Sequence, residues 1–271
     1  LFKPWPQSKV KAGTTCKRNP CLTAGTTQST TPQCGERPRA RDAWSPSSPA
    51  LSHAGLPQSM PGVLFSYRAS WIEPGSKTIK GIDEWKRIEK TIIKLKKNFP
   101  NIPLSLDTRK SYVMKKGIES GVDIINDVSG LNFDNKSFDI INLKKIPFVL
   151  HHMQGTPDTM QKNPSYDDAL LDIYDFFEER IKYVRLNGIK HNNIIIDPGI
   201  GFGKNLKHNM KLISNISIFH SLGFPILLGV SRKRFIKDVS GKHDSQQRLG
   251  GTVSSSLFSM MQGVQILRVH D

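Results

Sequence analysis

The feature that most constrains the fold is the stretch 192–204, in which an apolar run passes directly into a glycine-rich loop. Its three consecutive isoleucines, Ile194–Ile196, are typical of a strand that is buried on both faces in a parallel sheet. The run stops at Asp197, because Pro198 lacks the backbone N–H that a continuing strand would need. Alternating glycines then allow positive φ values and let a flat ligand approach the backbone. The pattern indicates either a ligand site at the C-terminal end of a parallel strand or a well-formed turn with a capping aspartate.

The composition of the chain changes near residue 61. Residues 1–61 contain all three cysteines and nine of the 17 prolines, and they show almost no hydrophobic periodicity. Of the formal net charge of +16, this segment carries +6 (8 basic, 2 acidic) and the remaining 210 residues carry +10 (31 basic, 21 acidic). We predict that residues 1–61 are a disordered or unrelated basic extension, because such a segment buries too little apolar surface to offset its ordering entropy. Residues 62–271 are predicted to form one folded domain.

The extension does not show the pattern of a nucleic-acid-binding arm, because its basic residues are scattered and lack interleaved aromatic residues. Its cysteines, Cys16, Cys21 and Cys34, do not have zinc-ribbon spacing, and their odd number argues against a closed disulfide set. No segment resembles a signal peptide or reaches membrane-spanning length, and the predicted domain contains no cysteine. We therefore expect a cytoplasmic protein with neither nucleic acid nor a membrane as its partner.

From residue 62 onward, strand-like and helix-like segments alternate. Strands are predicted at 102–106, 122–125, 146–150, 194–196, 224–229 and 264–267, with a less clear one at 63–67. Helices are predicted at 83–99 with Asp83 as its N-cap, 110–119, about 170–184, 206–220 and 246–262, and the segment around 138–143 is read as looser. Such βα alternation implies a parallel sheet with right-handed crossovers, which fits a doubly wound sheet or a (β/α)8 barrel.

Polar side chains follow six of the predicted strands, at or just beyond the point where each strand ends. They are Asp107, Asn126, His151, Asp197, Ser231 with Lys233, and Arg268 with His270. Each alone could cap the next helix. An open sheet concentrates its ligand contacts at one switch point, whereas a closed barrel collects them from nearly every strand. We therefore predict an α/β fold of the TIM (β/α)8-barrel type.

The chemistry of this polar set is consistent with one ligand. Two carboxylates, Asp107 and Asp197, and the Asn126 amide suit a nitrogen-rich heterocycle that has several donors on one edge. Cationic donors near the last strands suit a phosphate or diphosphate. A metal site built from His151 and His152 is not expected, because adjacent residues of a strand face opposite ways.

Six motifs, spaced along residues 74–271, carry a resemblance to a known family. They are Ser105–Thr108, Ile124–Asp127, His152–Gly155 with Thr159–Gln161, Asp197–Lys204, Gly229–Lys233 and Arg268–Asp271. Together they resemble dihydropteroate synthase. Members of that family are (β/α)8 barrels of folate biosynthesis. They join 6-hydroxymethyl-7,8-dihydropterin diphosphate to 4-aminobenzoate, release pyrophosphate, and are the target of sulfonamides.

The resemblance implies a role for each matching residue. The implied pterin-binding set is Asp107, Asn126, Asp197 and Lys233, of which Asp107, Asp197 and Lys233 are the catalytic residues; Arg268 and His270 hold the diphosphate, and Phe202 and Ser231 lie on the aminobenzoate side. The role of His151 stays open, since relatives often have Met there. The implied mechanism is dissociative, with Mg²⁺ on the diphosphate. A homodimer is also compatible with the family, which is usually dimeric through its C-terminal helices.

The chain also departs from the family pattern. We find no first-strand loop in residues 1–61, so the magnesium-binding Asn of that loop has no counterpart and no protein metal ligand is predicted. Glu73 stands where the second-strand loop of the family has an arginine, and no helix follows the last strand. We therefore expect a barrel that lacks its first strand and helix and its last helix, with impaired activity.

The alternative function is a non-catalytic pterin-binding protein or an inactive remnant. A weaker third candidate is an unrelated phosphate-binding barrel such as an aldolase or isomerase. A Schiff-base aldolase would need a buried lysine in a strand, whereas the lysines here are predicted to lie in loops or on exposed helix faces.

Overall fold

The computed structural model of the protein describes residues 64–69, 79–156 and 158–270. The predicted extension, residues 1–61, lies outside these ranges, and so does Glu73. The expectations about both stay predictions.

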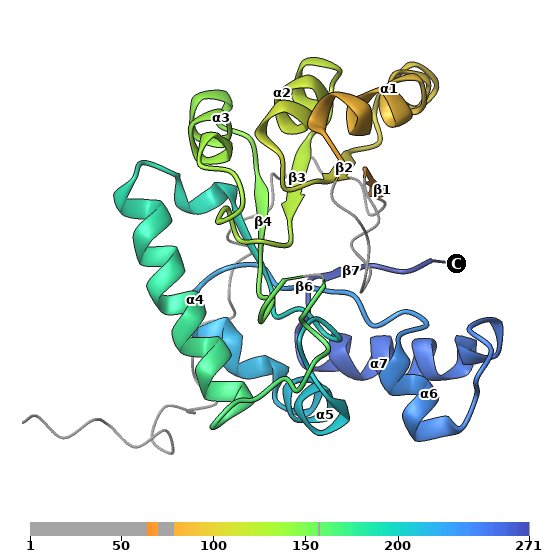
Figure 1. Cartoon of the computed structure of the whole chain (residues 1–271). Helices are drawn as coiled ribbons and strands as arrows, with labels where there is room; N and C mark the ends of the chain where they lie inside the picture. Colours follow the sequence, from red (N-terminus) through yellow and green to blue (C-terminus); the bar gives the residue numbers. More distant parts are fainter. Residues whose placement is uncertain (1–63, 70–78, 157, 271) are drawn as a thin grey trace, which may run out of the picture. The chain divides into compact units, whose positions relative to one another are not determined.

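Parallel strands in sequence order form the centre of the described part of the chain (Figure 1). The strands are β1 (Phe65–Arg68), β2 (Leu104–Asp107), β3 (Ile124–Asp127), β4 (Phe148–His151), β5 (Ile194–Asp197), β6 (Leu227–Leu228) and β7 (Ile266–Leu267). The first five form one sheet, β6 pairs with β7, and one parallel bridge, Ile196 to Ile226, continues the order from β5 towards β6. This winding without a reversal of strand order is that of a (β/α) barrel and not of a doubly wound sheet. No strand pairing joins β7 to β1 within the described residues.

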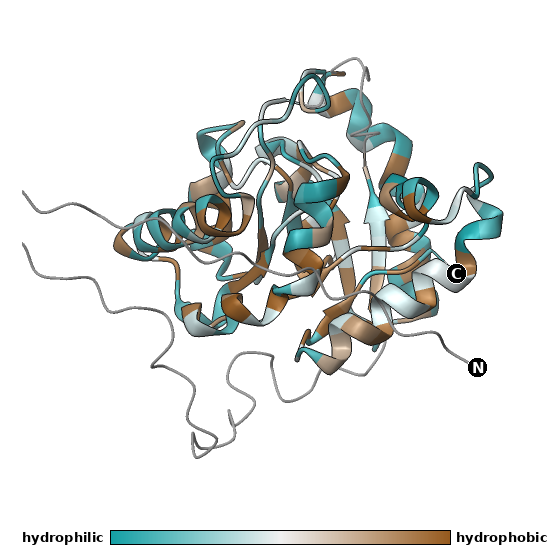
Figure 2. Ribbon diagram, turned by 90° about the horizontal axis from the view of Figure 1, so that it is seen from below, coloured by the Kyte–Doolittle hydropathy of each residue, from teal (hydrophilic) through white to brown (hydrophobic). Residues whose placement is uncertain are grey.

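Helices surround the strands in Figure 1. They are α1 (Gly81–Asn98), α2 (Ser111–Glu119), α3 (Lys136–Lys144), α4 (Ala169–Leu186), α5 (Leu206–Ser214), α6 (Arg234–Ser240) and α7 (Leu249–Met261). Helix α1 illustrates why they form: it buries Trp85, Ile88 and Ile92 at spacings of three and four, and most of its lysines are exposed to solvent. Figure 2 accordingly shows hydrophobic residues along the central strands and mixed colours along the helices. None of the helices in the described ranges is long and apolar enough to cross a lipid bilayer.

The apolar core has two parts. A large cluster fills the space between the strands and the helices, and a small second cluster contains only residues on or next to the strands. The small cluster consists of Ile124, Val149, Ile195 and Leu227, with Leu64 and Ile266 packed against it. Because side chains alternate across a strand, residues two positions further along face the same way. The small cluster therefore forms the floor on which the next inward-facing layer of side chains stands.

The sequence predicted some elements incorrectly. Asp83 is not the N-cap of α1: the helix begins after Lys80, which makes no side-chain cap, and Asp83 lies in the first turn, where a carboxylate is favourable. The segment around 138–143 is a regular helix, α3, although it buries only Ser137 and Ile141. Helix α6 was not predicted, because its seven residues are too few to show a periodic pattern.

Candidate active site

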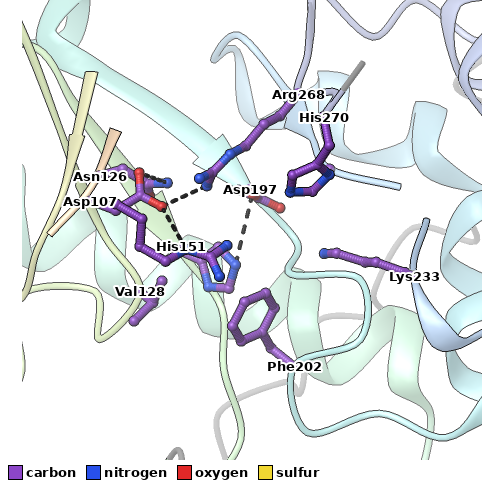
Figure 3. Close-up of a pocket in the computed structure, with 11 residues that line it drawn as sticks. Asp107, Asn126, Val128, His151, Asp197, Phe202, Lys233, Arg268 and His270 are labelled. Atoms are coloured by element: carbon purple, nitrogen blue, oxygen red, sulfur yellow. Dashed lines mark hydrogen bonds and ion pairs between the residues drawn. The ribbon is translucent and has the colours of Figure 1, made fainter. Parts of the chain in front are cut away.

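The floor of the barrel lies beneath a hollow at the C-terminal ends of the strands. The space between its lining residues, part of which is open to solvent, has a volume of about 470 Å³. It is lined by Arg68, Asp107, Asn126, Val128, His151, Asp197, Phe202, Gly229, Lys233, Arg268 and His270. Each strand, or the loop directly after it, contributes a lining residue. The structure thus brings together every predicted site residue except Ser231, and Figure 3 shows their side chains converging.

Asp107 is the most heavily bonded residue of the hollow. One of its carboxylate oxygens accepts a hydrogen bond from Asn126 Nδ2 at 3.1 Å and one from Ser66 Oγ at 3.4 Å. The other oxygen lies 2.7 Å from Arg268 Nη1 and 3.7 Å from Arg68 Nε. Both oxygens of this buried carboxylate therefore already have partners, so a ligand that reaches Asp107 must share or displace one of them.

Asn126 provides the opposite case. Its amide nitrogen donates to Asp107, which fixes the amide orientation, and its Oδ1 is buried without a hydrogen-bond partner in the described part of the chain. An unsatisfied buried acceptor costs free energy unless a ligand or water pairs with it. Asn126 Oδ1 is thus an acceptor available to a ligand that carries an N–H group.

Asp197 lies at the end of β5, where the sequence predicted it. Its Oδ1 accepts the Gly199 N–H at 2.8 Å, and its Oδ2 lies 3.8 Å from His151 Nε2. Burial raises the pKa of Asp197, while Lys233 and the Gly199 N–H act to lower it. The hydrogen bond to Gly199 orients the carboxylate at the start of the glycine loop.

The glycine loop has a shape that only glycine permits at two positions. A Cβ atom on Gly199 would lie 2.0 Å from the His152 carbonyl oxygen, and one on Gly203 would lie 2.6 Å from that of Gln154. The buried Lys204 fastens the loop, because its Nζ donates to the carbonyls of Gly199 at 3.0 Å and Phe202 at 2.9 Å. Directly after the loop, the Asn205 side chain accepts the His208 N–H at 2.9 Å and caps the start of α5.

Lys233 and Phe202 form a contact on the far side of the hollow. The Nζ atom lies 4.9 Å from the centre of the Phe202 ring and donates to the Ile200 carbonyl. Burial lowers the pKa of Lys233 from 10.5 to about 8, with Asp197 opposing the change and Arg268 contributing to it. The amine is therefore mostly protonated at pH 7 but loses its charge in mildly alkaline solution.

The two adjacent histidines face opposite ways, as predicted. His151 lines the hollow and meets Phe202 edge-on at a ring distance of 4.6 Å. His152 faces outwards, with its Nδ1 atom 3.0 Å from Lys204 Nζ and its ring 4.8 Å from that of Phe176. Burial and the charge of Lys204 hold the pKa of both histidines well below 6.5. Both imidazoles are therefore neutral at pH 7.

His270 and Ser231 are linked through the backbone. The Ser231 Oγ atom accepts the His270 backbone N–H at 3.2 Å, and the serine is buried. Ser231 does not line the hollow, and its place on the aminobenzoate side stays a prediction. In this structure its hydroxyl positions the segment that carries His270. Burial and the nearby Arg268 lower the pKa of His270.

Arg68 is the charged lining residue to which sequence reasoning gave no role. A signal for it was present, because Leu64, directly before β1, and Ser66, within it, precede Arg68 at alternate positions. The strand predicted at 63–67 has a weak pattern and stops one residue before Arg68. The sequence therefore assigns Arg68 no place in the site. In the structure Arg68 is paired in register with Asp107 on the neighbouring strand.

Comparison with known proteins agrees with this geometry. Residues 69–270 match the model of the pterin binding enzyme family. Dihydropteroate synthase from Synechocystis is 34% identical over 198 residues, which cover 73% of this chain and 68% of the relative. The structure of the Yersinia pestis dihydropteroate synthase in a sulfonamide drug complex superposes with a TM-score of 0.73 at 35% identity, covering 77% of this chain and 74% of that one.

The Xanthomonas albilineans dihydropteroate synthase is similar in two complexes. With 4-aminobenzoic acid, the TM-score is 0.69 at 35% identity, over 73% of this chain and 70% of that one. With 7,8-dihydropteroate, the TM-score is 0.67 at 34% identity, over 72% of each chain. The hollow at the strand ends, the family match and these likenesses lead to one conclusion: the chain belongs to the dihydropteroate synthase family of pterin-binding enzymes.

Proposed function

We propose that the chain catalyses the dihydropteroate synthase reaction, a transfer step of folate biosynthesis. The substrates are 6-hydroxymethyl-7,8-dihydropterin diphosphate and 4-aminobenzoate, and the products are dihydropteroate and pyrophosphate. One observation carries the proposal: a single hollow combines buried carboxylate and amide acceptors with several cationic side chains. The complexes of similar proteins with 4-aminobenzoic acid and 7,8-dihydropteroate support the same choice of substrates.

The buried side suits the pterin ring. A dihydropterin carries several N–H donors on one edge, and Asn126 Oδ1 and the Asp197 carboxylate are acceptors that such an edge requires. Lys233 also lines the hollow, and its amine supplies a donor for an acceptor atom of the pterin ring. Because the acceptors are already desolvated and held by their neighbours, they need little rearrangement when the ring binds.

The cationic side suits the diphosphate. Arg268 and His270 follow β7, and Lys233 follows β6, so their donors surround the same end of the hollow. The bond between the pterin methylene carbon and the diphosphate oxygen breaks, and the electron pair leaves with pyrophosphate. Cationic donors stabilise the negative charge that develops on this leaving group.

The amine of 4-aminobenzoate then forms the new bond. After diphosphate departs, the dihydropterin ring delocalises the positive charge of the methylene, and the Asp197 carboxylate beside the ring stabilises that charge. The nitrogen lone pair attacks the methylene carbon, and the amine releases a proton to solvent. Phe202, on the loop after β5, offers an aromatic surface for the aminobenzoate ring.

Magnesium remains a prediction. The residues that the structure describes contain no group of three or more His, Cys, Asp or Glu side chains that could hold a metal ion. The hollow has two carboxylates, Asp107 and Asp197, and each already has partners. We propose that any Mg²⁺ enters with the diphosphate and is held mainly by its oxygens, where it would neutralise charge on the leaving group.

Helix α7 suggests how two copies could associate. It exposes an apolar stripe at intervals of four residues, Leu249, Val253, Leu257 and Met261. We propose that this stripe forms a homodimer contact. Light scattering after size-exclusion chromatography should give twice the chain mass for the wild type and the chain mass for Leu257→Glu. A wild type that stays monomeric would contradict this proposal.

The function is tested by turnover and binding on the same preparation. We expect the chain to form dihydropteroate and pyrophosphate in equal amounts from the two substrates, and to bind the pterin diphosphate in calorimetry. Binding without turnover would favour the non-catalytic pterin-binding protein. Absence of both, with a cooperative unfolding transition, would refute the assignment.

A further inference from the structure

Arg68 is placed to contact the ligand, although neither the sequence motifs nor the fold assign it a role. It ends β1 opposite Asp107, and its side chain is 32% exposed. It lines the hollow together with Lys233, Arg268 and His270. The side chain of Arg68 therefore faces the same space as these three residues.

The guanidinium of Arg68 has few partners in the described part of the chain. It makes no hydrogen bond there, and its one ion pair joins Nε to Asp107 Oδ2 at 3.7 Å, beyond hydrogen-bond distance. The same oxygen is already taken by Arg268 Nη1 at 2.7 Å. A guanidinium carries five N–H donors in a planar fork. Arg68 therefore keeps donors that Asp107 does not satisfy.

The charge of Arg68 is also unbalanced. It is close enough to lower the pKa of both Lys233 and His270, as expected for like charges near one another. The residues that line the hollow include two carboxylates, those of Asp107 and Asp197. They include three side chains that carry a positive charge at pH 7, those of Arg68, Lys233 and Arg268. An anionic ligand in this space would remove the repulsion among the cations.

We propose that Arg68 is a further diphosphate-binding residue, which shares Asp107 with Arg268 until a phosphate group takes the place of that carboxylate. The inference rests on the proposed function and adds a residue to its site. An arginine fork binds phosphate oxygens through short, charge-assisted pairs, which are stronger than one long contact with an already paired carboxylate. Arg68 thus acts on the substrate directly and is distinct from a residue that only supports Asp107.

The test compares Arg68→Gln with Arg234→Gln. Arg234 is a suitable control because it lies on α6, its side chain is 79% exposed, and its ion pair is with Asp238 of the same helix. Calorimetry measures three ligands: inorganic pyrophosphate, the pterin diphosphate, and neutral 6-hydroxymethyl-7,8-dihydropterin. We expect Arg68→Gln to weaken both phosphate ligands about fivefold, with the neutral pterin changed less than about twofold. Arg68→Lys should fall between, and Arg234→Gln should match the wild type.

Two results would overturn the inference. If Arg68→Gln weakens the neutral pterin as much as pyrophosphate, Arg68 acts only by supporting Asp107. If pyrophosphate binding is unchanged, Arg68 does not contact phosphate. A thermal unfolding curve shows that each variant is folded. The pyrophosphate measurement does not depend on turnover, so failure of the proposed reaction and failure of this inference are separate outcomes.

Discussion

The two sides of the hollow are built differently. Asp107, Asn126 and Asp197 stand on four-residue strands that are buried at every position, and they are 1%, 2% and 6% exposed. Arg268 and His270 instead follow β7, a strand of two half-buried residues, and His270 is exposed to solvent. The acceptor side is therefore buried, while the cationic side is partly exposed to solvent. Charge–charge contacts on the cationic side are screened by salt, whereas contacts on the acceptor side keep their strength.

The difference indicates a division of labour. Recognition of the pterin ring depends on buried acceptors whose loss leaves unsatisfied groups on either partner. Recognition of the diphosphate depends on several cations, each contributing part of the total. Removing one residue should therefore cost more on the acceptor side than on the cationic side.

The largest effect is expected for Asp197→Asn. The substitution keeps the size of the side chain but removes the charge beside the developing ring cation, so kcat/KM should fall by about 10²–10³-fold, as for other preorganised electrostatic groups. Steady-state kinetics check this. Asp168→Asn is the matched control, because Asp168 caps α4 away from the hollow and Asn is an equally good N-cap. A loss of less than about tenfold for Asp197→Asn would contradict the division of labour.

On the cationic side, we expect His270→Ala to weaken the pterin diphosphate by about tenfold or less, because Arg268 and Lys233 remain. The affinity of the wild type for pyrophosphate should also fall as ionic strength rises from 50 to 500 mM, while neutral pterin affinity stays constant. Titrations at the two salt concentrations check both points. Equal salt sensitivity of the two ligands would contradict a division between the sides.

Lys233 connects the two sides, and its titration gives a prediction for pH. The pKa of Lys233 is lowered to about 8, so the amine is charged below this pH and neutral above it. Affinity for pyrophosphate should therefore fall as the pH rises through about 8, by at most about tenfold per unit. Pyrophosphate titrations from pH 7 to 9.5 check this, and Lys233→Met should remove the step. An unchanged step in that variant would assign the titration to another group.

The smallest effect concerns His151, which is buried on the acceptor side. Its folded-state pKa lies well below 6.5, so the folded protein binds fewer protons than the unfolded chain below that pH. His151 therefore lowers the free energy of unfolding as the pH falls through 6.5, by at most about 1.4 kcal/mol per unit. In urea unfolding at pH 7.5 and 5.5, His151→Met should lose less stability than the wild type.

Two other buried groups also affect stability in this pH range. Burial lowers the pKa of His152 well below 6.5 and raises the pKa of Asp127 to about 6. They act with opposite signs but are present in both proteins, so the difference between wild type and His151→Met isolates the contribution of His151. The same loss in both proteins would show that His151 does not cause the acid sensitivity.

The sequence predicted the acceptor side better than the cationic side. Asp107, Asn126 and Asp197 each end a strand that is buried at every position, so their place at the strand ends follows from the buried runs that precede them. Arg68 ends a strand whose pattern is weak, and its role as a lining residue appears only when Asp107 is placed beside it. For Ser231 the sequence position suggests a ligand contact. In the structure its hydroxyl oxygen accepts a hydrogen bond from the backbone N–H of His270.

The central claim is that one ligand spans two sides with separate tasks, and Asn126 tests it most directly. Calorimetry of Asn126→Ala with neutral 6-hydroxymethyl-7,8-dihydropterin and with pyrophosphate measures each task alone. We predict that pterin affinity falls by about tenfold or more, since a buried acceptor is lost, while pyrophosphate affinity changes less than about twofold. Equal losses for both ligands, or an unchanged affinity for the pterin, would contradict the account.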